Sequence, residues 1–325
     1  MVETEMELGK SGVRVLPLGT GCWAWGDRLF WGYGRDYHQE DIRQAFRISL
    51  AQGIDFFDTA ETYGFGQSEM YLGSFIQEFG AGRRIIVATK YFPYPWRVTP
   101  RAVVRTLQSS LRRLRLAAVD LYQVHRPIPH SGVEMWMQGM AEAVREGLAR
   151  AVGVSNFSAE LTQRAHEALA RRGVPLATNQ VQYNLLDRGL EWTGLERVCR
   201  DLGVTLIAYS PLAQGLLTGK YSPQHPLPGA YRRLQWGGFV NRAALLVATL
   251  REIGQAHEGK TPGQVALNWV ICKGALPIPG AKNAAQASEN AGALGWRLTS
   301  EEVALLDEAS SSGNALQQPS AMTRP

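Results

Sequence analysis

Short apolar runs alternate with longer amphipathic segments along almost the whole chain. The runs are rich in β-branched residues and recur eight times, near residues 16–20, 54–58, 85–89, 120–124, 150–154, 177–181, 204–208 and 275–279. Such runs are typical of short buried strands. Because strands that alternate with helices form parallel sheets, and because a chain of this length holds eight of them, the pattern favours a closed barrel over an open sheet.

The segments between the runs carry helix signals. Residues 41–53 place apolar side chains on one face and end at Gly53, which predicts a helix with a glycine C-cap. Thr99 followed by Pro100 predicts the start of a second helix. Thr299 and Glu302 have the spacing of a capping box at a third.

Both ends of the chain differ from this pattern. Two short apolar segments in residues 6–19 predict an additional β-hairpin before the first barrel strand, and the polar tail from Ser310 onward is expected to be loose. No internal repeat or linker divides the sequence, so we expect one domain over residues 1–325. The expected fold class is α/β: a (β/α)8 TIM barrel with an N-terminal β-hairpin and long loops at its C-terminal face.

Composition narrows the function classes. Of the 325 residues, 45% are hydrophobic and 19% are charged, which suits a large core. The net charge of +5 allows an anionic ligand but is too scattered to indicate nucleic-acid binding. Three scattered cysteines, an acidic N-terminus and short apolar runs predict a cytoplasmic protein without disulfides, a signal peptide or a membrane span.

Two phosphate-binding motifs are excluded. Residues 254–261 match the P-loop pattern, but the preceding segment reads as a helix instead of the required strand. Thr261, Pro262 and Gln264 instead predict a helix start with a capping box. The dinucleotide fingerprint G-x-G-x-x-G is absent, so a nicotinamide cofactor would not be bound in the Rossmann manner.

Polar residues capable of proton transfer follow three of the predicted strands. Asp58 ends one apolar run and Tyr63 lies just beyond it, while Lys90 and His125 end the next two runs. Catalytic residues of barrels lie at the C-terminal ends of the strands. An Asp–Lys pair can lower the pKa of a tyrosine and a histidine can hold a carbonyl, so the pattern predicts a proton-donating site.

Seven segments in order, "FFDTAETYG", "VATK", "DLYQVHRP", "VGVSNF", "NQVQYN", "IAYSPLAQGLLTGKY" and "IPGAKNAAQASENAGAL", resemble the aldo-keto reductases. The Trp-rich segment after the first strand is most similar to the plant-plastid and cyanobacterial members. The resemblance implies a (β/α)8 barrel that uses NADPH/NADP+ without a Rossmann domain and without a metal. It assigns Tyr63 as proton donor, Lys90 and Asp58 as the ion pair that tunes it, and His125 as the residue that orients the substrate carbonyl.

The resemblance also implies a cofactor groove. Ser155, Asn156 and Gln180 correspond to residues that bind the nicotinamide carboxamide, and Tyr209 corresponds to the aromatic residue that stacks on the ring. Lys282 corresponds to the residue that meets the 2′-phosphate. The turn from Ser210 to Gly215 would hold the pyrophosphate through its backbone amides, with Lys220 adding charge. The adenosine end would contact Gln286, Glu289 and Asn290. Many relatives have arginine at the position of Gln286, so phosphate binding by this chain is expected to be weaker than in those relatives. The full expected set is Gly21, Trp23, Ser155, Asn156, Gln180, Tyr209, Ser210, Pro211, Leu212, Gln214, Gly215, Lys220, Gly280, Lys282, Gln286, Glu289 and Asn290.

The substrate is less constrained than the cofactor. Aromatic residues of the loops around the barrel mouth suit an apolar or planar carbonyl compound, and those expected to contact it are Trp23, Trp31, Phe92 and Trp96. No convergent arginine pair marks a carboxylate or phosphate substrate, with Arg126, Arg232 and Arg233 as the exceptions left open. The favoured function is NADPH-dependent reduction of aldehydes and ketones. A pyridoxal reductase and a non-catalytic NADPH-binding regulatory subunit are the alternatives, and His125, which such subunits lack, favours catalysis. The physiological substrate and the oligomeric state stay open.

Overall fold

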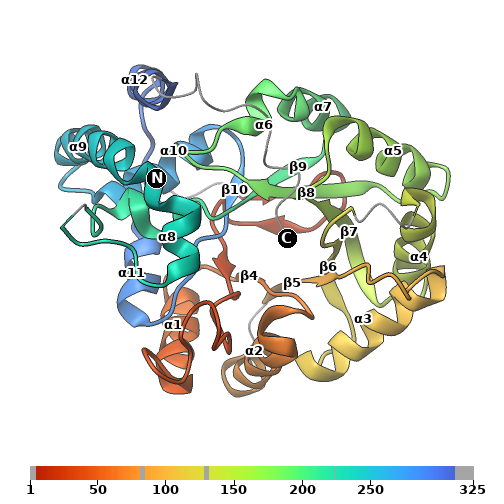
Figure 1. The fold of residues 1–325 in the computed structure, drawn as a ribbon. Coiled ribbons are helices and arrows are strands. Elements are labelled where there is room, and N and C mark those ends of the chain that lie inside the picture. The colour runs from red at the N-terminus through yellow and green to blue at the C-terminus, as the bar shows by residue number, and fades with distance from the viewer. Residues whose placement is uncertain (1–4, 81–84, 128–131, 223, 312–325) are drawn as a thin grey trace.

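The computed structural model describes residues 5–80, 85–127, 132–222 and 224–311. Eight parallel strands follow one another around the sheet in chain order, and helices surround them (Figure 1). The strands are β3 (Thr20–Gly21), β4 (Phe56–Asp58), β5 (Ile86–Tyr91), β6 (Val119–Val124), β7 (Ala149–Ser155), β8 (Leu176–Gln182), β9 (Thr205–Tyr209) and β10 (Leu276–Pro277). The eight predicted strands and the parallel sheet are confirmed.

The first and last strands meet and close the barrel. Gly19 N–H donates to Pro277 O, and Gly21 N–H donates to Pro279 O. Both hydrogen bonds are 3.0 Å long. A Cβ on Gly21 would lie 2.8 Å from Ile278 O, so only glycine allows this approach. The first strand is shorter than the predicted 16–20, because Pro17 has no N–H to donate to a ladder.

The helices lie outside the strands, and the three whose starts the sequence signals at Thr99, Thr261 and Thr299 predicted begin there. They are α1 (Gln39–Ala51), α2 (Gln67–Phe79), α3 (Pro100–Leu114), α4 (Val133–Arg145), α5 (Ala159–Ala170), α6 (Gly189–Trp192), α7 (Leu195–Leu202), α8 (Ala230–Trp236), α9 (Val240–Ala256), α10 (Pro262–Cys272), α11 (Ala284–Ala291) and α12 (Ser300–Ser311). The 3₁₀ turns are η1 (Tyr63–Gly66), η2 (Ala213–Thr218) and η3 (Gly237–Phe239). Thr99 caps α3 by accepting from Ala102 N–H at 3.2 Å, as predicted.

The other predicted helix signals are also confirmed. At α1 the C-cap is Gln52, and Gly53, the predicted cap, lies one residue beyond it with a φ of +86°. Thr261 and Gln264 form a capping box at α10, and Thr299 and Glu302 do so at α12. Because α9 precedes residues 257–261, the P-loop reading lacks its strand and is excluded.

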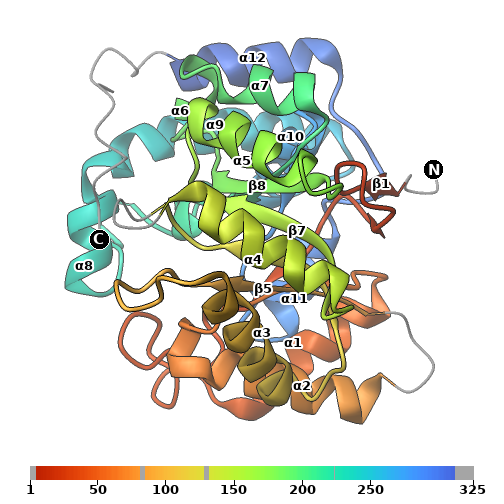
Figure 2. The same ribbon diagram turned by 90° about the vertical axis from the view of Figure 1, so that its right-hand side faces the viewer.

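The predicted hairpin lies at one end of the barrel. Strands β1 (Met6–Glu7) and β2 (Arg14–Val15) pair antiparallel. Leu8, Val13 and Val15 are buried against the interior side chains of the barrel. Figure 2 shows β1 on the opposite side of the molecule from α8. The hairpin therefore covers one end of the barrel and leaves the other end for the site.

The chain end departs in part from expectation. Ser310 and Ser311 belong to α12, and Ser310 accepts from Arg188, so they are not loose. Residues 312–325, the rest of the predicted tail, lie outside the described residues. Within the described ranges, the structure contains no helix with the length and apolar character needed to cross a membrane.

Candidate active site

Four side chains from three consecutive strand ends meet at the open end of the barrel. Asp58 is the last residue of β4, Lys90 lies near the end of β5, and His125 follows β6. Tyr63 begins η1, where Gly64 adopts a φ of +54° that turns the chain back over the barrel. Lys90 Nζ donates to Asp58 Oδ1, and also to Tyr63 Oη at 3.2 Å. The structure thus brings together the four residues expected to be catalytic.

Burial makes the Asp58–Lys90 pair a fixed feature of the site. Lys90 is 0% exposed and Asp58 is 1% exposed. The second carboxylate oxygen of Asp58 accepts from Gln180 Nε2 at 2.8 Å and from Gln123 Nε2 at 3.3 Å. Burial lowers the pKa of Lys90, but Asp58 and Tyr63 outweigh burial and the pKa is raised. Lys90 therefore stays an ammonium ion, which an unpaired buried lysine would not.

The pKa of Tyr63 shifts in the opposite direction from the one expected. Sequence reasoning expected Lys90 to lower this pKa. Burial raises the pKa of Tyr63, the Lys90 charge opposes this shift, and the net direction is upward. The contribution of Lys90 has the expected sign, but burial outweighs it, and how deeply the phenol is buried is a tertiary property that the sequence pattern does not give. Tyr63 is consequently a protonated phenol at neutral pH, the form that can donate a proton.

His125 lies beside Tyr63 as a neutral imidazole. The two ring centroids are 5.7 Å apart at an interplanar angle of 83°. The pKa of His125 is lowered well below its usual range by burial and by the nearby charges of Lys90 and Arg126. Its Nδ1 lies 3.5 Å from Thr62 Oγ1. A neutral imidazole carries one ring proton, and which nitrogen holds it decides whether Nδ1 donates to Thr62 Oγ1 or accepts from it; in the tautomer protonated on Nε2, that nitrogen can donate to a carbonyl oxygen.

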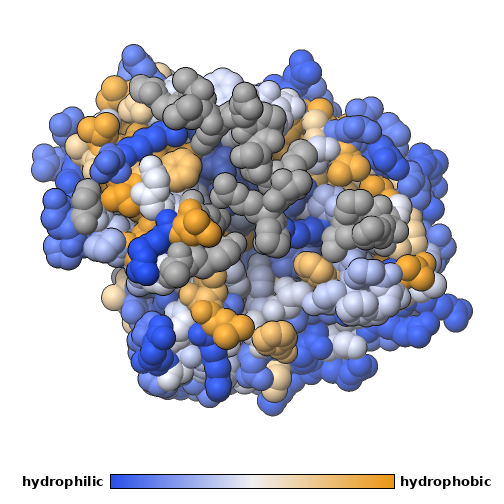
Figure 3. Space-filling model, viewed as in Figure 1, coloured by the Kyte–Doolittle hydropathy of each residue, from blue (hydrophilic) through white to orange (hydrophobic). Residues whose placement is uncertain are grey.

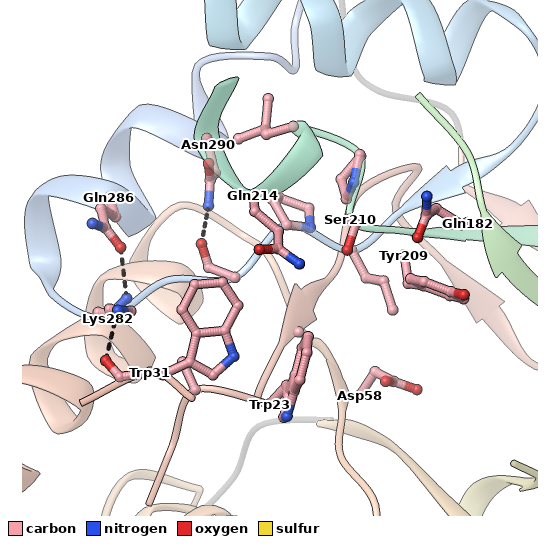
Figure 4. Close-up of a pocket in the computed structure, with 18 of the residues that line it drawn as sticks. Trp23, Trp31, Asp58, Gln182, Tyr209, Ser210, Gln214, Lys282, Gln286 and Asn290 are labelled. Atoms are coloured by element: carbon pink, nitrogen blue, oxygen red, sulfur yellow. Dashed lines mark hydrogen bonds between the residues drawn. The ribbon is translucent and has the colours of Figure 1, made fainter. Parts of the chain in front are cut away.

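A cavity of about 430 Å³ extends from these residues toward α11, where Gln286 and Asn290 lie (Figure 4), and Arg232 of α8 also lines it. Asp58, Tyr63 and His125 line it, whereas Lys90 lies behind Asp58 and Tyr63. Figure 3 shows apolar side chains over the α8 and α9 side of this face. All the residues expected to bind the cofactor line this cavity: Gly21, Trp23, Ser155, Asn156, Gln180, Tyr209, Ser210, Pro211, Leu212, Gln214, Gly215, Lys220, Gly280, Lys282, Gln286, Glu289 and Asn290.

The residues expected to bind the nicotinamide carboxamide belong to one connected network of hydrogen bonds. Asn156 Nδ2 donates to Ser155 Oγ at 3.0 Å and to His125 O at 3.1 Å, while Tyr209 Oη donates to Asn156 Oδ1 at 2.9 Å. Asn156 and Ser210 have φ values of +63° and +50°, which is uncommon for residues with a side chain. Sparsely populated backbone conformations of this kind cluster at ligand sites, and here they follow the ends of β7 and β9.

Positive charge gathers at the other end of the cavity. Lys220, Arg232 and Lys282 line it together. Burial and the charges of Arg232 and Lys220 lower the pKa of Lys282 to about 8. An anion here would relieve this repulsion, so the cluster fits a ligand that carries phosphate groups.

Trp31 lies between two of these cations. Lys282 Nζ donates to Trp31 O at 3.1 Å and lies 4.7 Å from its ring centroid, and the Arg232 guanidinium lies 5.1 Å from the same centroid. Arg232 also donates to Gln214 O at 2.6 Å. Arg233, the third arginine singled out in the sequence, is exposed, donates to Leu227 O and does not line this cavity.

The residues expected to contact the substrate separate into two groups. Trp23 and Trp31 line the cavity and contact each other edge to face, with centroids 5.3 Å apart. Phe92 does not line it but packs against the His125 ring at 5.7 Å. Trp96 is 73% exposed, stacks on Tyr94 and does not line the cavity.

Sequence reasoning missed several lining or supporting residues. Gln123 holds Asp58 from the barrel interior. It lies two positions before His125, so the period-2 alternation of a strand could have placed it on the same side. The missed lining residues, among others, are Gln182, Thr218 and Tyr221. In the part of the chain that the structure describes, no group of three or more His, Cys, Asp and Glu side chains could hold a metal ion.

Comparison with known proteins gives one consistent result. Residues 17–311 match the model of the Aldo/keto reductase family. The chain is 42% identical over 307 residues to "Pyridoxal reductase, chloroplastic" of Arabidopsis thaliana, covering 91% of this chain and 83% of the relative. The solved glycerol dehydrogenase of Gluconobacter oxydans is 27% identical with a TM-score of 0.82, covering 96% of each chain. An aldo/keto reductase of Klebsiella pneumoniae, solved with NADP and acetate, is 28% identical with a TM-score of 0.73, covering 92% of this chain and 93% of that one.

Proposed function

The chain belongs to the aldo/keto reductase family and is an NADP-dependent oxidoreductase, and from this premise we propose that it reduces aldehydes and ketones to alcohols. The observation that carries the proposal is the contact of Tyr63 Oη with Lys90 Nζ beside a neutral His125, on the wall of one cavity. A protonated phenol, an ammonium ion and a hydrogen-bond donor are the groups that carbonyl reduction requires.

Each residue has a distinct chemical task in this proposal. The bound NADPH supplies the hydride that reduces the carbonyl carbon. Tyr63 Oη gives its proton to the carbonyl oxygen, and His125 Nε2 holds that oxygen in place. Lys90 stabilises the tyrosinate that remains, and Asp58 keeps Lys90 charged.

The two ends of the cavity would bind different parts of the cofactor. Ser155, Asn156 and Gln180 would hold the carboxamide near Tyr63, and Tyr209 offers a ring face for stacking. Lys282 would pair with the 2′-phosphate, since its charge is crowded by other cations. We also propose that residues 1–325 act as one domain, which the family match over 17–311 supports.

Pyridoxal is the second candidate substrate. The Arabidopsis relative is named a pyridoxal reductase and shares 42% identity over nearly the whole chain. Pyridoxal is a planar aromatic aldehyde, which suits the aromatic wall made by Trp23 and Trp31. That relative is also named chloroplastic, so a plastid is the alternative to the expected cytoplasmic location.

The test is a spectrophotometric screen of NADPH oxidation over aldehydes, ketones, quinones and pyridoxal, with wild type and Tyr63→Phe. The substitution removes one oxygen, so kcat should fall by roughly 100-fold or more, the scale of lost general-acid catalysis. NADPH affinity, followed by quenching of tryptophan fluorescence, should be unchanged. Full activity in Tyr63→Phe would contradict the mechanism. A wild type that binds NADPH but reduces nothing would favour the regulatory alternative.

A further inference from the structure

The direction of the His125 imidazole depends on the side chains around it. The main chain of His125 is fixed, because its N–H donates to Tyr91 O at 2.8 Å and its carbonyl oxygen accepts from Asn156 Nδ2 at 3.1 Å. The imidazole can still rotate about two side-chain bonds. Tyr63 and Phe92 each pack edge to face on this ring, with centroids 5.7 Å away at an interplanar angle of 83°. The orientation of the ring therefore depends on how firmly its neighbours are held.

Tyr63 and Phe92 follow different strands, and an ion pair joins the two loops that carry them. Glu61 lies between β4 and η1, two residues before Tyr63, and its carboxylate accepts from Phe92 N–H at 2.7 Å. Both carboxylate oxygens of Glu61 also accept from the guanidinium of Arg97, in the loop between β5 and α3. Arg97 Nη1 in turn donates to Phe92 O at 2.8 Å. The pair thus holds both backbone polar groups of Phe92.

The Glu61–Arg97 pair is largely buried and well defined in direction. The side chains of Glu61 and Arg97 are 10% and 20% exposed. The guanidinium also lies 5.0 Å from the ring centroid of Tyr94 and 5.4 Å from that of Tyr91. A carboxylate that meets a guanidinium through both oxygens fixes an angle as well as a distance. Neither residue lines the cavity, so the pair acts on a bound molecule only through the residues that it holds.

Tyr63 has a support of its own, so loss of the ion pair would fall mainly on His125. Lys90 Nζ donates to Tyr63 Oη at 3.2 Å from the barrel interior. The His125 ring instead contacts side chains that the two joined loops carry. Phe92 packs against one side of it, and the hydroxyl of Thr62 lies 3.5 Å from Nδ1. Separating the loops would therefore release the imidazole while the proton donor stays in place.

We propose that Glu61 and Arg97 are positioning residues that direct the His125 imidazole toward the substrate carbonyl. They act through Phe92, whose backbone they hold and whose ring packs against His125. The inference rests on the proposed reductase function. Without the pair, the hydrogen bond from the imidazole to the carbonyl oxygen is misaligned, which slows the chemical step. Cofactor affinity is unaffected, because the pair lies outside the cavity.

The experiment measures the single-turnover rate of NADPH oxidation by a reactive aldehyde. NADPH is bound before mixing, so that cofactor exchange does not limit the rate. In Glu61→Gln this rate should fall by roughly 10-fold, since a misplacement of about 1 Å at a catalytic group costs up to about 100-fold. Arg97→Gln removes the more exposed partner, should have the same effect and replaces Glu61→Gln if that variant does not fold. Because the two residues act as one unit, the double variant should lose no more than either single variant.

Two controls separate positioning from a general loss of stability. The side chain of Glu191 is also 10% exposed and pairs with Arg188 away from the cavity, so Glu191→Gln should lower stability and leave the rate unchanged. In a His125→Ala background, Glu61→Gln should cause no further loss, because the group that it positions is gone. The ring ¹⁵N resonances of His125, assigned by their disappearance in His125→Ala, should shift in Glu61→Gln and not in Glu191→Gln.

The outcomes distinguish this inference from the function on which it rests. A wild-type rate in folded Glu61→Gln and Arg97→Gln overturns the inference. An equal fold loss from Glu61→Gln in the wild-type and His125→Ala backgrounds also overturns it, since the effect would then not pass through His125. Either result leaves the reductase proposal standing. If the wild type oxidises bound NADPH with no carbonyl compound, the reductase proposal fails, and this inference fails with it.

Discussion

Lys90 shows at the scale of one residue what the barrel interior does to an ionisable side chain. A fully buried ammonium ion is unfavourable unless a counter-charge and hydrogen bonds compensate it. Asp58, Thr59 O and Tyr63 Oη supply those contacts. The residue types and their order could be predicted from the sequence, because each follows an apolar run. The net pKa of Tyr63 could not, because it depends on how deeply the phenol is buried.

The raised pKa of Tyr63 predicts the pH dependence of the reaction. Reduction needs the protonated phenol, and its pKa lies above the usual value of about 10. The pKa of His125 lies well below its usual range, so the imidazole stays neutral through neutral pH. With saturating NADPH, kcat for aldehyde reduction should therefore stay flat through neutral pH and decline only at alkaline pH, above the usual tyrosine pKa. An alkaline decline centred near pH 8 would contradict the assignment of a buried phenol.

The lowered pKa of Lys282 predicts that the affinity for NADPH depends on pH. Its pKa of about 8 means that the free protein loses this charge as pH rises through 8. A bound 2′-phosphate raises the pKa of Lys282, so NADPH affinity should weaken above pH 8 by up to about ten-fold per pH unit. NADH, which lacks that phosphate, should show little change. Fluorescence titrations from pH 7 to 9.5 measure both constants.

A matched pair of variants controls the Lys282 prediction. Lys282→Arg keeps a charge whose pKa lies above about 12, so the pH dependence should disappear while the preference for NADPH remains. Lys282→Ala should lower that preference by about 1–3 kcal/mol. If neither variant changes the ratio of NADPH to NADH affinity, Arg232, which contacts the same Trp31 ring, makes the selection instead.

At the scale of elements, local sequence signals predicted where several helices begin. They did not predict features that depend on tertiary packing. Thr99, Thr261 and Thr299 cap the helices that their neighbours predicted. Helix α8 was not predicted: it carries none of the start signals found at Thr99, Thr261 and Thr299, and its N-cap position is Gly229. Arg232 reaches the cavity only because α8 packs over it, and no local pattern indicates that placement.

The cap of α3 gives a prediction confined to one element. Thr99 Oγ1 satisfies the backbone N–H of Ala102 at the start of α3. Thr99→Ala should lower the free energy of unfolding by about 1 kcal/mol, the usual cost of losing an N-cap side chain. Thr99→Ser keeps the hydroxyl and should retain most of the stability. Urea denaturation measures both variants, and equal losses in the two would indicate that the methyl group, and not the cap, carries the effect.

At the scale of the whole molecule, the barrel separates stability from chemistry. Strand order, closure and the end that carries the site could all be argued from the sequence, because eight apolar runs and the residues after them fix one topology. Leu8, Val13 and Val15 pack into the barrel interior at the hairpin end, whereas Tyr63 and Lys282 line the cavity at the other. In barrels the hairpin-side face is expected to serve stability and the opposite face catalysis.

This separation predicts that a hairpin variant loses stability and keeps activity. Leu8 is fully buried, so Leu8→Ala should lower the free energy of unfolding by about 2–5 kcal/mol through lost burial and a residual cavity. Arg14, in the same hairpin, has an exposed side chain, and Arg14→Gln should change stability by less than about 0.5 kcal/mol. Below the unfolding transition of Leu8→Ala, both variants should keep the wild-type kcat and NADPH affinity. A loss of kcat in folded Leu8→Ala would show that the interior layers transmit strain from the hairpin to Asp58 and Lys90, so that the two ends of the barrel are mechanically coupled.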